Sequence, residues 1–221
     1  MRIACAPRLR PSGVLRSVDG MALGYVRPAR DEDTAEIARV QYDTWRIAYP
    51  RFIPRFAVDA VRPEWLAEQW AEAVSRPPSD RHRVLVAIEQ AEDAPEHLVG
   101  FTAIGPADET ALAPDETPPE AAPDAATAAP AQAGPGLAAA AITDLLVEPR
   151  WGRRGHGSRL LAAAVELWRS DGFDRAVAWA FAEDVATVKF LGSAGWEPDG
   201  ATRSLDVEGI LVPQARLHVA L

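Results

Sequence analysis

Apolar residues along this chain follow two different spacings, which divide the sequence into helices and strands. Where they recur every three to four positions they indicate one apolar face of a helix, and short apolar runs between turn residues are typical of strands. The first spacing predicts helices near 34–49, 63–74, 156–171 and 184–194. The second predicts strands over 24–28, 83–88, 97–104, 139–147, 175–181, 202–207 and 210–219.

The order of these elements, β-α-α-β-β-β-α-β-α-β-β, indicates the fold class. It is typical of an α/β protein in which helices cover both faces of one mixed sheet of about seven strands. We expect the last two strands to form a hairpin around Glu208-Gly209. In the second helix Trp65, Leu66 and Trp70 line one side, and we expect both tryptophans in the core.

Two segments show neither the helical nor the strand spacing, and they mark the limits of the expected domain. Residues 1–21 carry proline and glycine without a periodic pattern, so we expect a flexible N-terminal extension, and Met21 is an alternative start. Residues 106–137 hold seven prolines, six acidic residues and no basic residue. Such a composition buries too little apolar surface to fold alone and predicts a disordered insertion. The remainder of 22–221 is expected to form a single domain.

Composition narrows the classes of partner. The net charge of −9 argues against a nucleic-acid partner. Cys5 is the only cysteine, so a disulfide framework or a cysteine zinc site within one chain is excluded, as is typical of a cytoplasmic protein. No apolar run approaches the ~20 residues of a membrane span. We therefore expect a cytoplasmic protein with no nucleic-acid, membrane or metal partner.

A basic, glycine-rich loop joins the fourth strand to the third helix. It holds Arg153, Arg154, Gly155 and Gly157, and it leads into the helix at Ser158. The first turn of a helix has unpaired N–H groups and partial positive charge, and glycines let a ligand approach that backbone. The loop therefore predicts a phosphate or pyrophosphate site. A P-loop would need lysine where Ser158 stands, and the glycine order differs from the dinucleotide-binding pattern.

Two segments resemble motifs of the GNAT N-acetyltransferase superfamily. Val147-x-Pro149 followed by Arg154-Gly155-x-Gly157 is similar to its acyl-CoA-binding motif, an apolar strand ending in Val-x-Pro and then Gln/Arg-x-x-Gly-x-Gly/Ala. Residues 185–200 are similar to its second segment. Trp45-Arg46-x-x-Tyr49 resembles a pattern common in bacterial members of unassigned substrate. Together these segments identify the chain as a member of the superfamily.

The resemblance implies an acetyl-CoA co-substrate and places it. In the family the fourth and fifth strands splay apart, the pantetheine arm pairs with the end of the fourth strand, and loop amides hold the pyrophosphate. Carried over to this chain, the strand contributes Leu145, Leu146 and Val147, and the loop contributes Arg153, Arg154, Gly155, His156, Gly157 and Ser158. Gly152 stands where the family usually has Gln or Arg, so the basic contact is expected to shift by one residue.

The chemistry implied is direct attack of an amine on the acetyl thioester within a ternary complex. Leu191 stands where the family often has a tyrosine that protonates the thiolate, and water or Ser193 is the candidate for that task. For the base, Asp144, Glu183 and Asp184 are the candidates, although a surface carboxylate or a helix cap is the alternative for each, and Asp184 has the position of an N-cap. Strand alternation is expected to direct Asp144 away from the side of Thr143 and Leu145, unless a bulge intervenes.

Trp45 and Tyr49 are the candidate acceptor-binding residues, with a place in the core as the alternative. The resulting expectation is an N-acetyltransferase that acts on the primary amine of a small molecule. A non-catalytic acyl-CoA-binding regulatory module and a protein or peptide N-acetyltransferase are the alternatives. The sequence also leaves a homodimer open.

Overall fold

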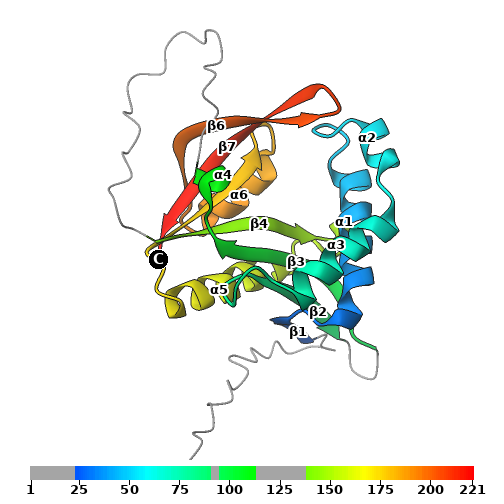
Figure 1. Cartoon of the computed structure of the whole chain (residues 1–221), viewed down its shortest axis with the longest axis horizontal. Helices are drawn as coiled ribbons and strands as arrows, with labels where there is room; N and C mark the ends of the chain where they lie inside the picture. The colour runs from blue at the N-terminus through cyan, green and yellow to red at the C-terminus, as the bar shows by residue number, and fades with distance from the viewer. Residues whose placement is uncertain (1–22, 91–94, 113–137) are drawn as a thin grey trace, which may run out of the picture.

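The computed structural model of the chain describes residues 23–90, 95–112 and 138–221. Its strands form one mixed sheet in the order β1-β2-β3-β4-β5-β7-β6, which confirms the predicted fold class (Figure 1). All neighbouring strands are antiparallel except β4 and β5, which are parallel. The strands are β1 (Leu23–Pro28), β2 (Arg83–Gln90), β3 (His97–Pro106), β4 (Ala139–Val147), β5 (Arg175–Phe181), β6 (Glu197–Val207) and β7 (Ile210–Ala220).

Helices cover both faces of the sheet, as the element order predicted. α1 and α3 pack on one face, and α5 and α6 pack on the other. The helices are α1 (Thr34–Ala48), α2 (Arg55–Ala60), α3 (Pro63–Ser75), α4 (Glu109–Leu112), α5 (His156–Ser170) and α6 (Val185–Ser193), with short 3₁₀ turns at Asp31–Asp33 and Pro149–Trp151.

Each face has its own apolar core, and β2 contributes to both. Leu85 and Ala87 pack beneath α5, whereas Val86 and Ile88 pack beneath α1 and α3. Successive side chains of a strand point to opposite faces, so a strand covered on both sides is apolar throughout. This arrangement explains why 83–88 reads as a continuous apolar run.

The two tryptophans of α3 have different environments. Trp70 is buried as predicted, and its indole N–H donates to the Gln41 side chain at 2.8 Å. Trp65 is 46% exposed, so the prediction that it lies in the core is wrong. Leu66 and Trp70, four residues apart, form the buried stripe. Trp65 precedes Leu66 by one residue, which is a rotation of about 100° around a helix of 3.6 residues per turn, so its side chain lies outside this stripe.

The pairing of β4 explains how the sheet opens. β4 and β5 pair only from Ala139↔Arg175 to Ile142↔Ala178, and β5 then continues alongside β7 alone. Beyond Ile142 the edge of β4 that faces β5 is therefore not paired to a described strand. This divergence is the splay between the fourth and fifth strands that the resemblance implied.

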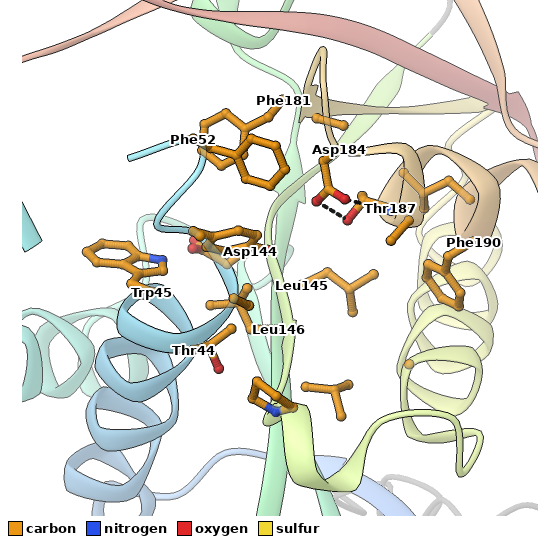
Figure 2. Close-up of a pocket in the computed structure, with 18 of the residues that line it drawn as sticks. Thr44, Trp45, Phe52, Asp144, Leu145, Leu146, Phe181, Asp184, Thr187 and Phe190 are labelled. Carbon is orange, nitrogen blue, oxygen red and sulfur yellow. Dashed lines mark hydrogen bonds between the residues drawn. The ribbon is translucent and has the colours of Figure 1, made fainter. Parts of the chain in front are cut away.

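An irregularity in the β3–β4 register lies at the start of that opening. Ala103 pairs with Asp144 and Ile104 with Ile142, so Thr143 is an extra residue on β4. Beyond this bulge Leu145 packs on the α5 side of the sheet and Leu146 on the α1 side. Figure 2 shows Leu145 and Leu146 on opposite sides of β4, with Asp144 on the side of Leu146. The expected direction of Asp144 is thus confirmed.

The predicted insertion at 106–137 begins with a helical turn. α4 (Glu109–Leu112) lies against β5, where the Trp179 indole N–H donates to the Ala111 carbonyl at 3.0 Å. This hydrogen bond joins the first residues of the segment to the sheet, and disorder over 106–137 as a whole stays a prediction. Its remainder, 113–137, and the N-terminal extension lie outside the described residues.

The closing hairpin has the predicted turn. Val207 pairs with Ile210, and both residues between them, Glu208 and Gly209, have positive φ (52° and 82°). That geometry matches the right-handed twist of the two strands. In Figure 1 the tip of the β6–β7 hairpin extends toward α2. Within the described part of the chain, none of the helices is both long enough and apolar enough to span a membrane.

Candidate active site

One cavity of about 1400 Å³ follows the opening between β4 and β5. It is larger than the ~300–1,000 Å³ of a typical small-molecule site, so it has room for two substrates or for one long one. Its walls come from the start of α5, the exposed edge of β4, the ends of α1 and β5, and the β6–β7 hairpin (Figure 2). The predicted site residues that line it are Trp45, Tyr49, Asp144, Leu145, Leu146, Val147, Arg153, Gly155, His156, Gly157, Ser158, Glu183 and Ser193.

The start of α5 forms one end of the cavity. Gly155 precedes the helix with a left-handed φ of 82°, and the first helical hydrogen bond runs from the Arg159 N–H to the Gly155 carbonyl at 3.0 Å. The N–H groups of residues 156–158 precede that bond and have no carbonyl four residues back within the helix. They can therefore bind an anion, as the sequence predicted.

Gly157 is closely covered by α6. A Cβ atom at this position would lie 3.3 Å from Cζ of Phe190. The absence of a side chain lets the Phe190 ring pack directly against the helix start. Figure 2 shows Phe190 on α6, facing the α5 side of the cavity. Glycine at 157 thus permits close approach of α6 to the first turn of α5.

The three arginines of the loop have different surroundings. Arg150 pairs with Glu148 at 2.8 Å, and the Arg154 guanidinium lies 4.7 Å from the ring centre of Trp151. Arg153 lines the cavity and has a left-handed φ of 65°, which is uncommon for a residue other than glycine. Arg154 is not among the residues that line the cavity. Of the three arginines, Arg153 is therefore the one that lines the cavity.

The imidazole of His156 is directed into the protein. It is 1% exposed, and its Nε2 lies 3.2 Å from a carboxylate oxygen of Glu89. Burial lowers its pKa, against the opposing effect of the Glu89 charge. The imidazole is thus neutral at pH 7, and what His156 offers a ligand is its main-chain N–H.

Asp144 is held in the middle of the cavity, just after the β4 bulge. Burial raises the pKa of this carboxyl to about 6 from the usual 3.8, and a hydrogen bond with Thr143 opposes the shift. A carboxylate with this pKa is mostly ionised at pH 7 and is a stronger proton acceptor than a solvated one. That Asp144 is half-buried could not be predicted from sequence, because its exposure depends on α1 packing over β4.

The other predicted catalytic residues lie on the opposite wall. Glu183 and Ser193 are both exposed, and the Ser193 hydroxyl donates to the Phe190 carbonyl at 2.6 Å. Leu191 is buried and lines the cavity. Asp184, interpreted from sequence as a helix cap, accepts from the Thr187 N–H at 3.1 Å and from its hydroxyl at 2.6 Å. That interpretation is confirmed.

An aromatic cluster joins the ends of α1 and β5. The ring centres of Phe52 and Phe181 lie 5.3 Å apart in a stacked arrangement, and Tyr49 lies 5.8 Å from Phe52 and 5.6 Å from Phe181. Burial raises the pKa of Tyr49, and the charges of Asp184 and Asp144 raise it further. Tyr49 was predicted from sequence as a site residue, and the two phenylalanines were not. The position of Phe181 at the end of the fifth predicted strand, beside the expected opening, could have indicated it.

A comparison with protein families matches residues 42–196 to the model described as the acetyltransferase (GNAT) family. A search of curated proteins found no match.

Solved structures share the fold. A ribosomal-protein-alanine N-acetyltransferase from Brucella melitensis is 19% identical, covering 89% of this chain and 99% of that one, with a TM-score of 0.57. The yncA protein of Salmonella typhimurium, solved with its cofactor acetyl-CoA, is 15% identical over 90% and 94% of the two chains, with a TM-score of 0.54. PaiA N-acetyltransferase from Thermoplasma acidophilum, in complex with coenzyme A, is 14% identical over 90% and 99%, with a TM-score of 0.58.

Proposed function

This chain belongs to the acetyltransferase (GNAT) family and is an acyltransferase, and from that premise we propose that it moves the acetyl group of acetyl-CoA onto a primary amine of a small molecule. The observation that carries the proposal is the continuity of one cavity. It runs from the anion-binding start of α5, past the unpaired edge of β4, to the Asp144 carboxyl.

Acetyl-CoA fits this cavity in one orientation. The pyrophosphate binds the N–H groups of residues 156–158, with the Arg153 guanidinium beside it. The amides of the pantetheine arm pair with the β4 edge over Leu145–Val147, as an added strand would. Relatives of the same fold solved with acetyl-CoA and with coenzyme A support this choice of co-substrate.

Asp144 is the proposed base. The ammonium first loses a proton to the Asp144 carboxylate. The neutral amine nitrogen then attacks the thioester carbonyl carbon, a C–N bond forms, the C–S bond breaks, and the second proton on nitrogen passes to solvent. Glu183 is the less favoured candidate because it is exposed. A thiol has a pKa near ~8.5, so coenzyme A can depart as thiolate and take its proton from solvent. The Ser193 hydroxyl already donates to a carbonyl, which argues against Ser193 as the acid.

Release of coenzyme A thiol in the presence of acetyl-CoA and a panel of amines tests the proposal. We expect turnover with at least one small amine, and an Asp144→Asn variant that binds coenzyme A normally in calorimetry but turns over slowly. Binding of acetyl-CoA without turnover of any small amine would contradict the proposal. Turnover of peptides alone would instead establish a protein acceptor, as the names of some structural relatives suggest.

A further inference from the structure

Two features distinguish the part of the cavity beyond Asp144: its aromatic walls and the distribution of its charges. From them we infer that the acceptor is a primary amine on an aromatic or other large apolar group, with no carboxylate next to the amine. This inference names the substrate class for the proposed function and rests on it.

Rings from separate elements form the wall. Tyr49 directly follows α1, Phe52 lies in the turn before α2, and Phe181 ends β5. All three line the cavity, and the three centre-to-centre distances among them are between 5.3 and 5.8 Å. Figure 2 shows Phe52 and Phe181 side by side above the opening that contains Asp144. Such a cluster offers a ring-shaped ligand an aromatic surface to pack against.

The surrounding wall is apolar as well. Trp45 lies half-buried on α1, on the same side of β4 as Asp144 (Figure 2). Ile53 and Val58 follow on the α2 side, and Leu205 and Val207 face them from the β6–β7 hairpin. A small polar amine would leave this apolar surface in contact with water, whereas an aromatic or long apolar group would cover it.

The interior charges of this region are negative. Asp144 is half-buried and Asp184 is buried, and the charges of both act on Tyr49, which places the two carboxyls around the aromatic cluster. They would attract an ammonium group and repel a carboxylate. The basic residues that line the cavity, Arg51, Arg153 and Lys189, are all exposed. The Arg51 guanidinium lies beside the aromatic cluster, 5.7 Å from the ring centre of Phe52, so two carboxyls and one exposed arginine surround the cluster. An amino acid would bring its carboxylate toward the two acids.

Three amines test the aromatic wall and the negative interior charge separately. 2-Phenylethylamine carries the ring and the ammonium, phenylalanine adds a carboxylate, and ethylamine removes the ring. With acetyl-CoA saturating, we expect kcat/KM for 2-phenylethylamine to exceed that of each of the others at least tenfold. Equal or better turnover of phenylalanine would overturn the exclusion of a carboxylate and would assign Arg51 as its partner. Equal or better turnover of ethylamine would overturn the aromatic subsite.

A matched pair of variants locates the subsite. Phe52→Ala should lower kcat/KM for 2-phenylethylamine about tenfold more than for ethylamine, because a stacked ring contact is lost. Phe56→Ala is the control, since Phe56 is 57% exposed on α2 and does not line the cavity. Equal losses for both amines in Phe52→Ala would overturn the placement.

A measurement of acceptor binding distinguishes a failure of this inference from a failure of the proposed function. Calorimetry of the coenzyme A complex with 2-phenylethylamine measures acceptor binding without the reaction. Binding that Phe52→Ala weakens, with no acetyl transfer, would uphold the aromatic subsite and overturn the acetyltransferase proposal. Transfer to other amines, without binding of 2-phenylethylamine, would overturn only the inferred substrate class. If neither binding of 2-phenylethylamine nor acetyl transfer to any amine is observed, the inferred substrate class and the acetyltransferase proposal are both overturned.

Discussion

Gly157 at the start of α5 lies directly beneath the edge of the Phe190 ring of α6, where an added Cβ would be 3.3 Å from Cζ and 3.5 Å from Cε2. The two residues frame the end of the cavity where main-chain N–H groups are available to an anion. A side chain at 157 would have to displace the ring or occupy the path of the ligand. Their contact thus couples α6 to the proposed pyrophosphate site.

We expect Gly157→Ala to weaken binding of coenzyme A about tenfold, since its methyl group would press on the Phe190 ring and shift either that ring or the first turn of α5, whose N–H groups are proposed to bind the diphosphate. Isothermal titration calorimetry measures the effect. Gly192→Ala is the matched control, because Gly192 lies within α6 and nothing stands within 4 Å of its added Cβ. An unchanged affinity in Gly157→Ala would show that the diphosphate binds elsewhere.

Arg153 and Arg150 provide a second matched pair. Arg153 lines the cavity, whereas Arg150 is engaged by Glu148 at 2.8 Å. Arg153→Ala is expected to weaken coenzyme A binding several-fold and to reduce its dependence on salt, because one charge-assisted contact is lost. Arg150→Ala should leave both quantities close to those of the wild type. The reverse result would place the phosphates nearer to Arg150.

The pH dependence of turnover tests Asp144 as base. Its pKa is raised to about 6 by burial, and only the ionised form can accept a proton. With acetyl-CoA saturating, kcat should therefore rise with pH through about 6 and fall away below it. Asp144→Asn should lower kcat by about 10²-fold or more and remove this step. If Glu183→Gln removes the step instead, Glu183 is the base.

Stability should change in the opposite direction from activity. The folded protein holds the Asp144 proton more tightly than the unfolded chain, because the pKa rises from 3.8 to about 6 on folding. Its contribution to the unfolding free energy therefore falls as pH rises from 4 to 6 and stays low above that. Asp144→Asn should raise the unfolding free energy at pH 7 by about 1–3 kcal/mol and have little effect at pH 4. Urea unfolding at both pH values measures this difference, and equal effects at both would contradict it.

The sequence by itself determined the elements and the glycine-rich loop that precedes α5. Apolar spacing is a local property, so the strands and the long helices could be predicted, and so could the Asp184 cap and the Glu208–Gly209 turn. The loop before α5 could be interpreted for the same reason, since the unpaired N–H groups of a helix start depend only on adjacent residues.

Only the tertiary structure decided which side chains meet. Whether Asp144 is buried depends on α1 packing across β4, and whether Trp65 is exposed depends on which stripe of α3 faces the sheet. Phe52 and Phe181 are far apart in sequence and become neighbours because β5 separates from β4 and ends beside the turn after α1. Contacts of this kind are set by the packing of distant elements, which the spacing of residues along one element cannot specify.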